Sequence, residues 1–165
     1  MPLFLARSIS VAKWHSSTDI AAGEIAADAV TADMKTQDNA LSFWTCNPAD
    51  TQTLEDVALA LAAKADHISK MDLVWVEGAE VAKVPLKLVP EPGDTPAKTL
   101  VNNHRNVVGI DVVRLSRLSQ AVAKAIHQNQ TRRLTVKQVR DCLNAGIQAK
   151  KVDKIDLNPK LASKL

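Results

Sequence analysis

The chain has 165 residues and a formal net charge of +3, with 46% apolar, 24% charged and 3% aromatic residues. This composition is typical of a globular protein that buries its core without disulfides or a metal, and the scarcity of rings argues against a stacking surface for single-stranded nucleic acid. No run of 18 apolar residues occurs, which excludes a membrane-spanning helix and makes a membrane no expected partner.

The start of the chain and the cysteines indicate where the protein works. The first 18 residues contain no acid and several serines, as a transit peptide would, but Leu3 to Trp14 alternates apolar and other residues and so predicts a strand. Cys46 and Cys142 are interpreted as buried free thiols that need no oxidising compartment. We therefore expect a cytoplasmic protein.

Helices and strands alternate over the next part of the chain. Asp19–Met34 is rich in alanine with apolar residues four apart, which predicts a helix. The apolar run Ala40–Cys46 predicts a buried strand. Leu54–His67 carries one apolar stripe after Thr53, a favourable N-cap, and predicts the clearest helix.

Two further strands and a stiff segment follow that helix. Leu73–Glu77 predicts a strand, and Val84–Leu88 predicts a half-exposed strand that Pro85 places at a sheet edge. The segment Pro90–Thr99 has three prolines and a glycine, which predicts a stiff loop or a linker.

The last part of the chain is predicted to be one strand and two helices. Asn106–Val113 predicts the strand, and Ser116 is the expected N-cap of a helix over Arg117–Gln128. Thr135 is the expected N-cap of a second helix that ends near Gly146.

These elements predict an α+β fold with a mixed β-sheet of about five strands and four helices, the last two forming a basic helical hairpin. The expected divisions are an acidic α+β part over residues 1–89, a Pro-rich loop or linker over 90–99, and a basic part of strand and helices over 100–165. All three can also belong to one domain.

Positive charge is concentrated late in the chain. Residues 1–97 contain seven Lys or Arg and fourteen Asp or Glu, whereas residues 98–165 contain fourteen Lys or Arg and four Asp or Glu. The net charges are therefore −7 and +10. Such asymmetry between halves is a hint about partners and carries no information about the fold.

The first hypothesis is a non-enzymatic binding protein whose basic helices contact a polyanion, nucleic acid in particular. Exposed cations neutralise phosphates without reading bases. The expected contacts are Arg117, Lys124, Arg132, Arg133, Lys137, Arg140, Lys150 and Lys151. The segment Leu134–Ile155 resembles a helix-turn-helix in its pattern, with a capped helix and a turn containing Gly146.

The second hypothesis is a protein-interaction subunit or a homo-oligomer, in which acidic residues of protein pair with the basic residues. Solvated charge, or an acidic half that covers the basic half within one chain, explains the pattern without a nucleic acid. Pairing across two copies predicts a homo-oligomer, and an exposed surface predicts a subunit that binds another protein.

The third hypothesis is a Mg²⁺-dependent nuclease. Asp72, Glu77, Glu80 and Lys83 surround a predicted strand, and such enzymes use acids to hold the metal and a lysine to polarise water. The Glu80-x-x-Lys83 spacing is one residue too long for a regular strand, and a charged turn between strands explains it as well. No metal-ligand spacing of His or Cys and no nucleotide-binding glycine motif occurs, so no cofactor is expected.

Overall fold

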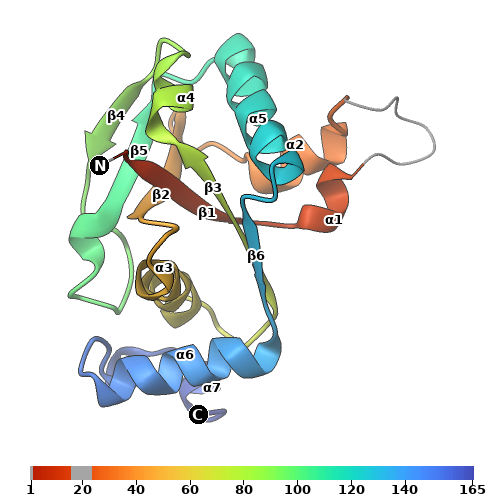
Figure 1. Cartoon of the computed structure of the whole chain (residues 1–165). Coiled ribbons are helices and arrows are strands. Elements are labelled where there is room, and N and C mark those ends of the chain that lie inside the picture. Colours follow the sequence, from red (N-terminus) through yellow and green to blue (C-terminus); the bar gives the residue numbers. More distant parts are fainter. Residues whose placement is uncertain (1, 16–23) are drawn as a thin grey trace.

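The computed structural model describes residues 2–15 and 24–165. The strands are β1 (Phe4–Ile9), β2 (Ala40–Cys46), β3 (Met71–Glu77), β4 (Lys87–Pro90), β5 (His104–Val108) and β6 (Thr131–Leu134). The helices are α1 (Val11–Trp14), α2 (Ala27–Asp33), α3 (Thr51–Ala63), α4 (Gly78–Ala82), α5 (Val112–His127), α6 (Val136–Gln148) and α7 (Pro159–Ala162), with 3₁₀ turns η1 (Val101–Asn103) and η2 (Lys154–Asp156). The α+β class is confirmed: the described residues form one six-stranded sheet, in the order β4-β5-β2-β1-β3-β6, with helices on both sides (Figure 1).

The sheet is antiparallel although strands and helices alternate along the chain. β1 lies between β2 and β3 and pairs with both, with Phe4 opposite Cys46 on one side and opposite Glu77 on the other. β2 and β3 therefore run parallel to each other but are kept apart by β1, and α3 makes the crossover between them. The expected mixed sheet is corrected accordingly, since every strand pair among the described residues is antiparallel.

Both faces of the sheet are apolar because its central strands are covered on each side. Leu5 and Val74 pack into one core with α1, α2 and α5, and we call this side the α5 face. Ala6 and Leu73 pack into a second core with α3, α6 and α7, on the side we call the α3 face. Successive strand residues point to opposite faces, so the three layers follow from continuous apolar runs such as that of β3.

Side chains cap the three long helices. Asp50 caps α3, because its side chain accepts a hydrogen bond from the Gln52 amide. Asp111 caps α5 in the same way by accepting from the Arg114 amide. The predicted caps Thr53 and Ser116 are therefore wrong, because an earlier aspartate starts each helix. Thr135 is confirmed as the N-cap of α6, where it closes a capping box.

The first and fourth strands also differ from their predicted bounds. β1 ends at Ile9, and α1 replaces the rest of the expected strand. Residues 19–23 of the first predicted helix lie outside the described residues, and α2 covers Ala27–Asp33. β4 lies at the sheet edge, as Pro85 predicts, but begins at Lys87, three residues after the predicted start at Val84.

The predicted basic helical hairpin is wrong because β6 lies between its two helices. α5 ends in a Schellman motif: Asn129 has a positive φ of 57°, its amide donates to Ile126 O, and the Gln130 amide donates to Ala125 O. The chain then pairs with β3 as β6. Figure 1 shows the result, with α5 on one side of the sheet and α6 on the other.

The predicted helix-turn-helix is also wrong. α6 ends in a second Schellman motif, in which Lys150 has a φ of 56° and the Lys151 amide donates to Gly146 O at 2.9 Å. The turn sends the chain back along α6 into η2 and α7, and Leu161 of α7 is buried in the α3-face core. No second helix of recognition length follows α6 in the described residues.

The Pro-rich segment is a packed loop that joins two parts of one sheet. The Thr95 hydroxyl donates to Ala60 O of α3 at 2.7 Å, and the Gly93 amide donates to Val101 O at 2.9 Å. Ala97 and Leu100 are buried in the α3-face core. Because β5 pairs with β2 and β4, and β6 pairs with β3, residues 100–165 complete the sheet that residues 1–89 begin.

Candidate functional site

The eight basic residues expected to bind phosphates do not share one face. They lie on α5 (Arg117, Lys124), β6 (Arg132, Arg133), α6 (Lys137, Arg140) and the loop after α6 (Lys150, Lys151). Since α5 and α6 pack on opposite faces of the sheet, their cations point away from each other. Even within β6 the two neighbouring arginines alternate between the faces.

Acids from the first 97 residues pair with four of these eight cations. The closest nitrogen–oxygen distances are 3.2 Å for Lys124–Glu80, 3.2 Å for Arg132–Glu55, 2.6 Å for Arg133–Asp72 and 2.6 Å for Lys151–Asp56. Lys137 pairs with Asp141 on the same helix at 2.7 Å. Within the described residues, Arg117, Arg140 and Lys150 are exposed and have no such partner. Acids of the first part thus neutralise half of the eight candidate cations across the fold.

The Arg133–Asp72 pair is the least exposed at its acidic end. Asp72 is only 8% exposed and accepts from Arg133 Nε at 2.6 Å and from Nη2 at 2.9 Å. These hydrogen bonds lower the pKa of Asp72 below its ordinary value, against the opposing effect of burial. The carboxylate is therefore ionised at neutral pH and already engaged.

The four residues of the nuclease hypothesis are not brought together. Asp72 and Glu77 lie at opposite ends of β3, roughly 17 Å apart at the usual rise per strand residue. Glu80 lies in α4 and binds Lys83, its C-cap, at 2.7 Å. The charged turn is therefore helical, and no group of three His, Cys, Asp or Glu that could hold a metal occurs among the described residues.

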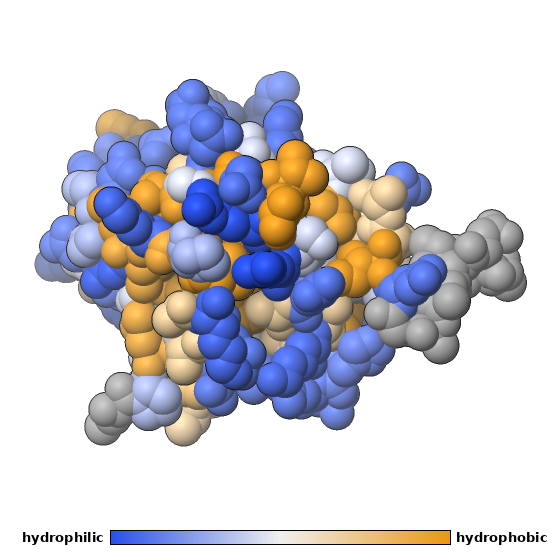
Figure 2. Space-filling model, turned by 90° about the horizontal axis from the view of Figure 1, so that it is seen from above, coloured by the Kyte–Doolittle hydropathy of each residue, from blue (hydrophilic) through white to orange (hydrophobic). Residues whose placement is uncertain are grey.

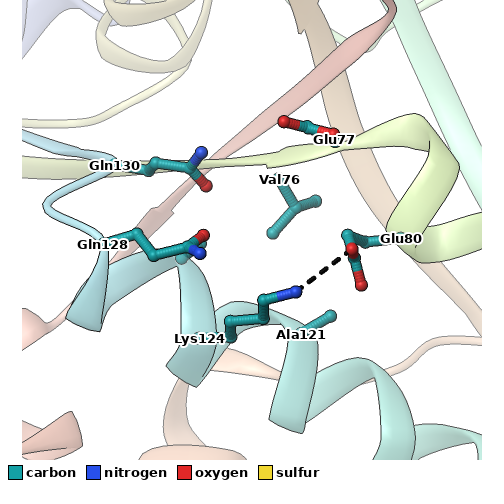
Figure 3. A pocket seen from close by; sticks show the side chains of 8 residues that line it. Val76, Glu77, Glu80, Ala121, Lys124, Gln128 and Gln130 are labelled. Carbon is teal, nitrogen blue, oxygen red and sulfur yellow. Dashed lines mark hydrogen bonds and ion pairs between the residues drawn. The ribbon is translucent and has the colours of Figure 1, made fainter.

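A small polar pocket lies where α4 meets α5 (Figure 3). Its volume is about 80 Å³, and Val76 of β3 lies between its polar side chains. Lys124 reaches across to Glu80, and Gln128 and Gln130 face them from the end of α5. Hydrogen bonds from Lys83 and Lys124 lower the pKa of Glu80. The pocket has room for water or an ion. The Lys124–Glu80 pair at its side links α5 to α4.

A larger hollow is an apolar groove between α2 and α5, which the sequence did not reveal. Its volume is about 540 Å³. We call it the α2–α5 groove, and its lining is Glu24, Ile25, Ala27, Val30, Thr31, Val112, Leu115, Ser116, Ser119 and Gln120. Val112 is 83% exposed and its neighbour Val113 is 62% exposed. Figure 2, a view from the end where α5 begins, shows apolar surface among hydrophilic side chains.

One sequence signal could have located this groove. Val112 and Val113 were assigned to the end of a strand, but Asp111 precedes them and is a favourable helix cap. With the helix started there, Leu115 extends the buried stripe of Leu118 and Val122, and Val112 lies one turn before Leu115 at the edge of that stripe. The apolar stripe of α5 therefore continues to Val112, which the α5-face core leaves exposed beside the groove.

No protein-family model, curated protein or solved structure matches this chain. Among the helices of the described residues, none is long and apolar enough to cross a membrane.

Proposed function

We propose that the chain is a non-enzymatic protein-interaction module that binds an amphipathic helix of a partner protein in the α2–α5 groove. The observation that carries this proposal is the exposed apolar lining of that groove. Val112 and Val113 are adjacent, highly exposed and set beside a hollow of about 540 Å³. Contiguous exposed apolar surface on a folded chain marks an interaction site more often than isolated apolar residues do.

The shape of the groove favours a helical partner. Along α5 the lining residues Val112, Leu115, Ser116, Ser119 and Gln120 follow the spacing i, i+3, i+4, i+7, i+8. This stripe is about 12 Å long at the helical rise, so about two turns of a partner helix match it. α2 forms the other wall, and two helical walls with an apolar floor are the usual receptor for an amphipathic helix.

The ion pairs of the chain also favour this function over nucleic-acid binding. A nucleic acid requires a continuous positive surface, and five of the eight candidate cations are already paired with carboxylates. Those pairs sit on both faces of the sheet. The α2–α5 groove needs no free charge: Ile25, Val30 and Leu115 pack partly against the α5-face core, while Val112 remains largely exposed.

Displayed peptides provide the test. A library of random 16-residue peptides is selected against the purified chain, and recovered binders are measured by fluorescence anisotropy with wild type, Val112→Glu and Val136→Glu. Val112 and Val136 are each the first residue of a helix with a side-chain cap, and an acid there suits the helix dipole, so both variants should fold. We expect amphipathic binders whose affinity falls about tenfold or more only in Val112→Glu.

Two outcomes would contradict the proposal. Binders that lose no affinity in Val112→Glu place their site elsewhere. A dimer of the chain alone in sedimentation, abolished by Val112→Glu and kept in Val136→Glu, assigns the groove to a second copy in place of a partner helix.

A further inference from the structure

A hollow beside α1, lined by none of the residues that line the α2–α5 groove, gathers three cations from separate elements. Its volume is about 340 Å³, and Lys13 of α1, Lys70 before β3 and Arg133 of β6 all line it. A second hollow of about 370 Å³ adjoins it, shares Asp72 and Arg133 with it, and extends to His15. We propose that this cationic hollow binds the phosphate of a small phosphorylated molecule.

The cations of the hollow have hydrogen-bonding capacity to spare. Lys13 and Lys70 are exposed and have no carboxylate within ion-pairing distance among the described residues. Arg133 uses Nε and Nη2 for Asp72, so that its Nη1 donors remain available within the described part of the chain. Arginine and lysine together give a phosphate charge-assisted hydrogen bonds from several directions.

The two carboxylates in the hollow are occupied by donors of the protein. Asp33 Oδ2 accepts from the Ser10 amide and from Trp14 Nε1, both at 2.8 Å, which fixes α1 against α2. Asp72 accepts from Arg133 and orients its guanidinium. Three cations against two acids leave the hollow with a positive charge. An uncharged ligand would gain nothing from that charge, whereas a phosphate dianion would.

The hollow has the size of a small-molecule site. Ligand pockets span roughly 300–1,000 Å³, and the two adjoining hollows give room for a sugar or glycerol body beside the phosphate. The exposed hydroxyls of Ser8 and Ser10 lie at the same hollow and can bond to the hydroxyls of that body. A nucleic-acid strand would need further free cations in line, and the nearby pairs do not supply them.

The test uses inorganic phosphate, glycerol 3-phosphate and a single-stranded oligonucleotide as probes, titrated into the full chain and followed by amide NMR shifts. We expect saturable binding of glycerol 3-phosphate in the millimolar range or tighter, weaker binding of inorganic phosphate, and an approximately tenfold loss in Lys13→Ala and in Lys70→Ala. Lys87→Ala, on the edge strand β4, is the matched control because it removes one exposed lysine far from the hollow and should bind like wild type.

Three results would overturn the proposal: no saturable binding of either phosphate, equal binding in the two hollow variants and the control, or an oligonucleotide that binds at Lys13 and Lys70 much more tightly than glycerol 3-phosphate. The last would assign the cations to a nucleic acid. None of these results tests the α2–α5 groove. The groove is tested separately by Val112→Glu, which leaves Lys13 and Lys70 in place.

Discussion

Arg133 and Asp72 face each other in register across β6 and β3 and are joined by two hydrogen bonds. One residue belongs to the basic part of the chain and the other to the acidic part. The pair therefore shows what the separated charge does in this fold: it links strands and helices from the two halves. The Arg132–Glu55 pair links β6 to α3 in the same way, and the Lys151–Asp56 pair links the loop after α6 to α3.

Arg133→Ala should destabilise the chain measurably, because Asp72, which is only 8% exposed, loses both of its charged donors. The loss should depend on pH. The folded pKa of Asp72 lies below its unfolded value, so the pair stabilises above the ordinary carboxyl pKa of about 3.9 and that stabilisation disappears as pH falls through the lower folded pKa. Urea unfolding at pH 7 and at pH 3 measures both effects.

Arg140→Ala is the control for this prediction, since Arg140 is exposed on α6 and has no carboxylate partner among the described residues. Its free energy of unfolding should stay within about 0.5 kcal/mol of wild type. A deficit in Arg133→Ala that is equally large at both pH values would show that packing, and not the Asp72 charge, accounts for it.

Lys150 and Lys151 are neighbours with different roles. Lys151 binds Asp56 of α3 at 2.6 Å and is only partly exposed, whereas Lys150 is exposed and unpaired within the described residues. Lys151→Met should lower the free energy of unfolding by about 1 kcal/mol, and Lys150→Met should have almost no effect. Denaturant titrations at low and high salt provide the measurement. An equal loss of unfolding free energy in the two variants would show that the Lys151–Asp56 pair does not stabilise the fold.

Gly93 fixes the Pro-rich loop against Trp44. An added Cβ would overlap the Trp44 ring and lie 3.0 Å from the Cβ of His104, whose ring meets Trp44 edge-on. Gly93→Ala should therefore cost about 1–3 kcal/mol through overpacking and shift the tryptophan emission. Gly109→Ala should also lose stability, because Gly109 has a φ of 79°, but nothing lies within 4 Å of its added Cβ and the emission should not change. Unchanged emission in Gly93→Ala would show that the loop moves away freely.

Local patterns predicted what local interactions determine. The α+β class, the cap at Thr135 and the edge position of β4 depend on neighbouring residues and were found. The buried stripe of Leu118, Val122 and Ile126 likewise faces the sheet. These features follow from the helical period, capping chemistry and the missing amide of proline.

Contacts between distant residues could not be read from those patterns. Arg132 and Arg133 belong to β6, a strand of only four residues that forms by pairing with the edge of β3. Nothing in the local sequence distinguishes so short an edge strand from a loop. Arg133 and Asp72 are 61 residues apart, and Lys151 and Asp56 are 95 apart. Pairing at such separations is decided by the tertiary fold, so the sequence showed the excess of charge and not its neutralisation.

Both thiols should react slowly at neutral pH. Burial raises the pKa of Cys46 to about 12, and burial with the nearby Glu55 and Asp56 charges raises that of Cys142 to about 11. Cys142 Sγ also donates to Glu55 O at 3.2 Å. Because the thiolate is the reactive form, alkylation by iodoacetamide should be far slower than for a free cysteine and should accelerate on unfolding in urea. Rapid modification of the native chain at pH 7.5 would contradict this.

Lys150 occupies a backbone conformation that favours glycine, and replacing it should stabilise the protein. It is the left-handed residue of the Schellman motif after α6, with a φ of 56°. A side chain in this region costs roughly 1–2 kcal/mol relative to glycine, part of which is offset by the freedom that glycine gives the unfolded chain. Lys150→Gly should therefore raise the free energy of unfolding by about 0.5–1 kcal/mol, whereas Lys154→Gly, in η2, should not. Calorimetry of the two variants measures the difference, and destabilisation by Lys150→Gly would contradict the motif.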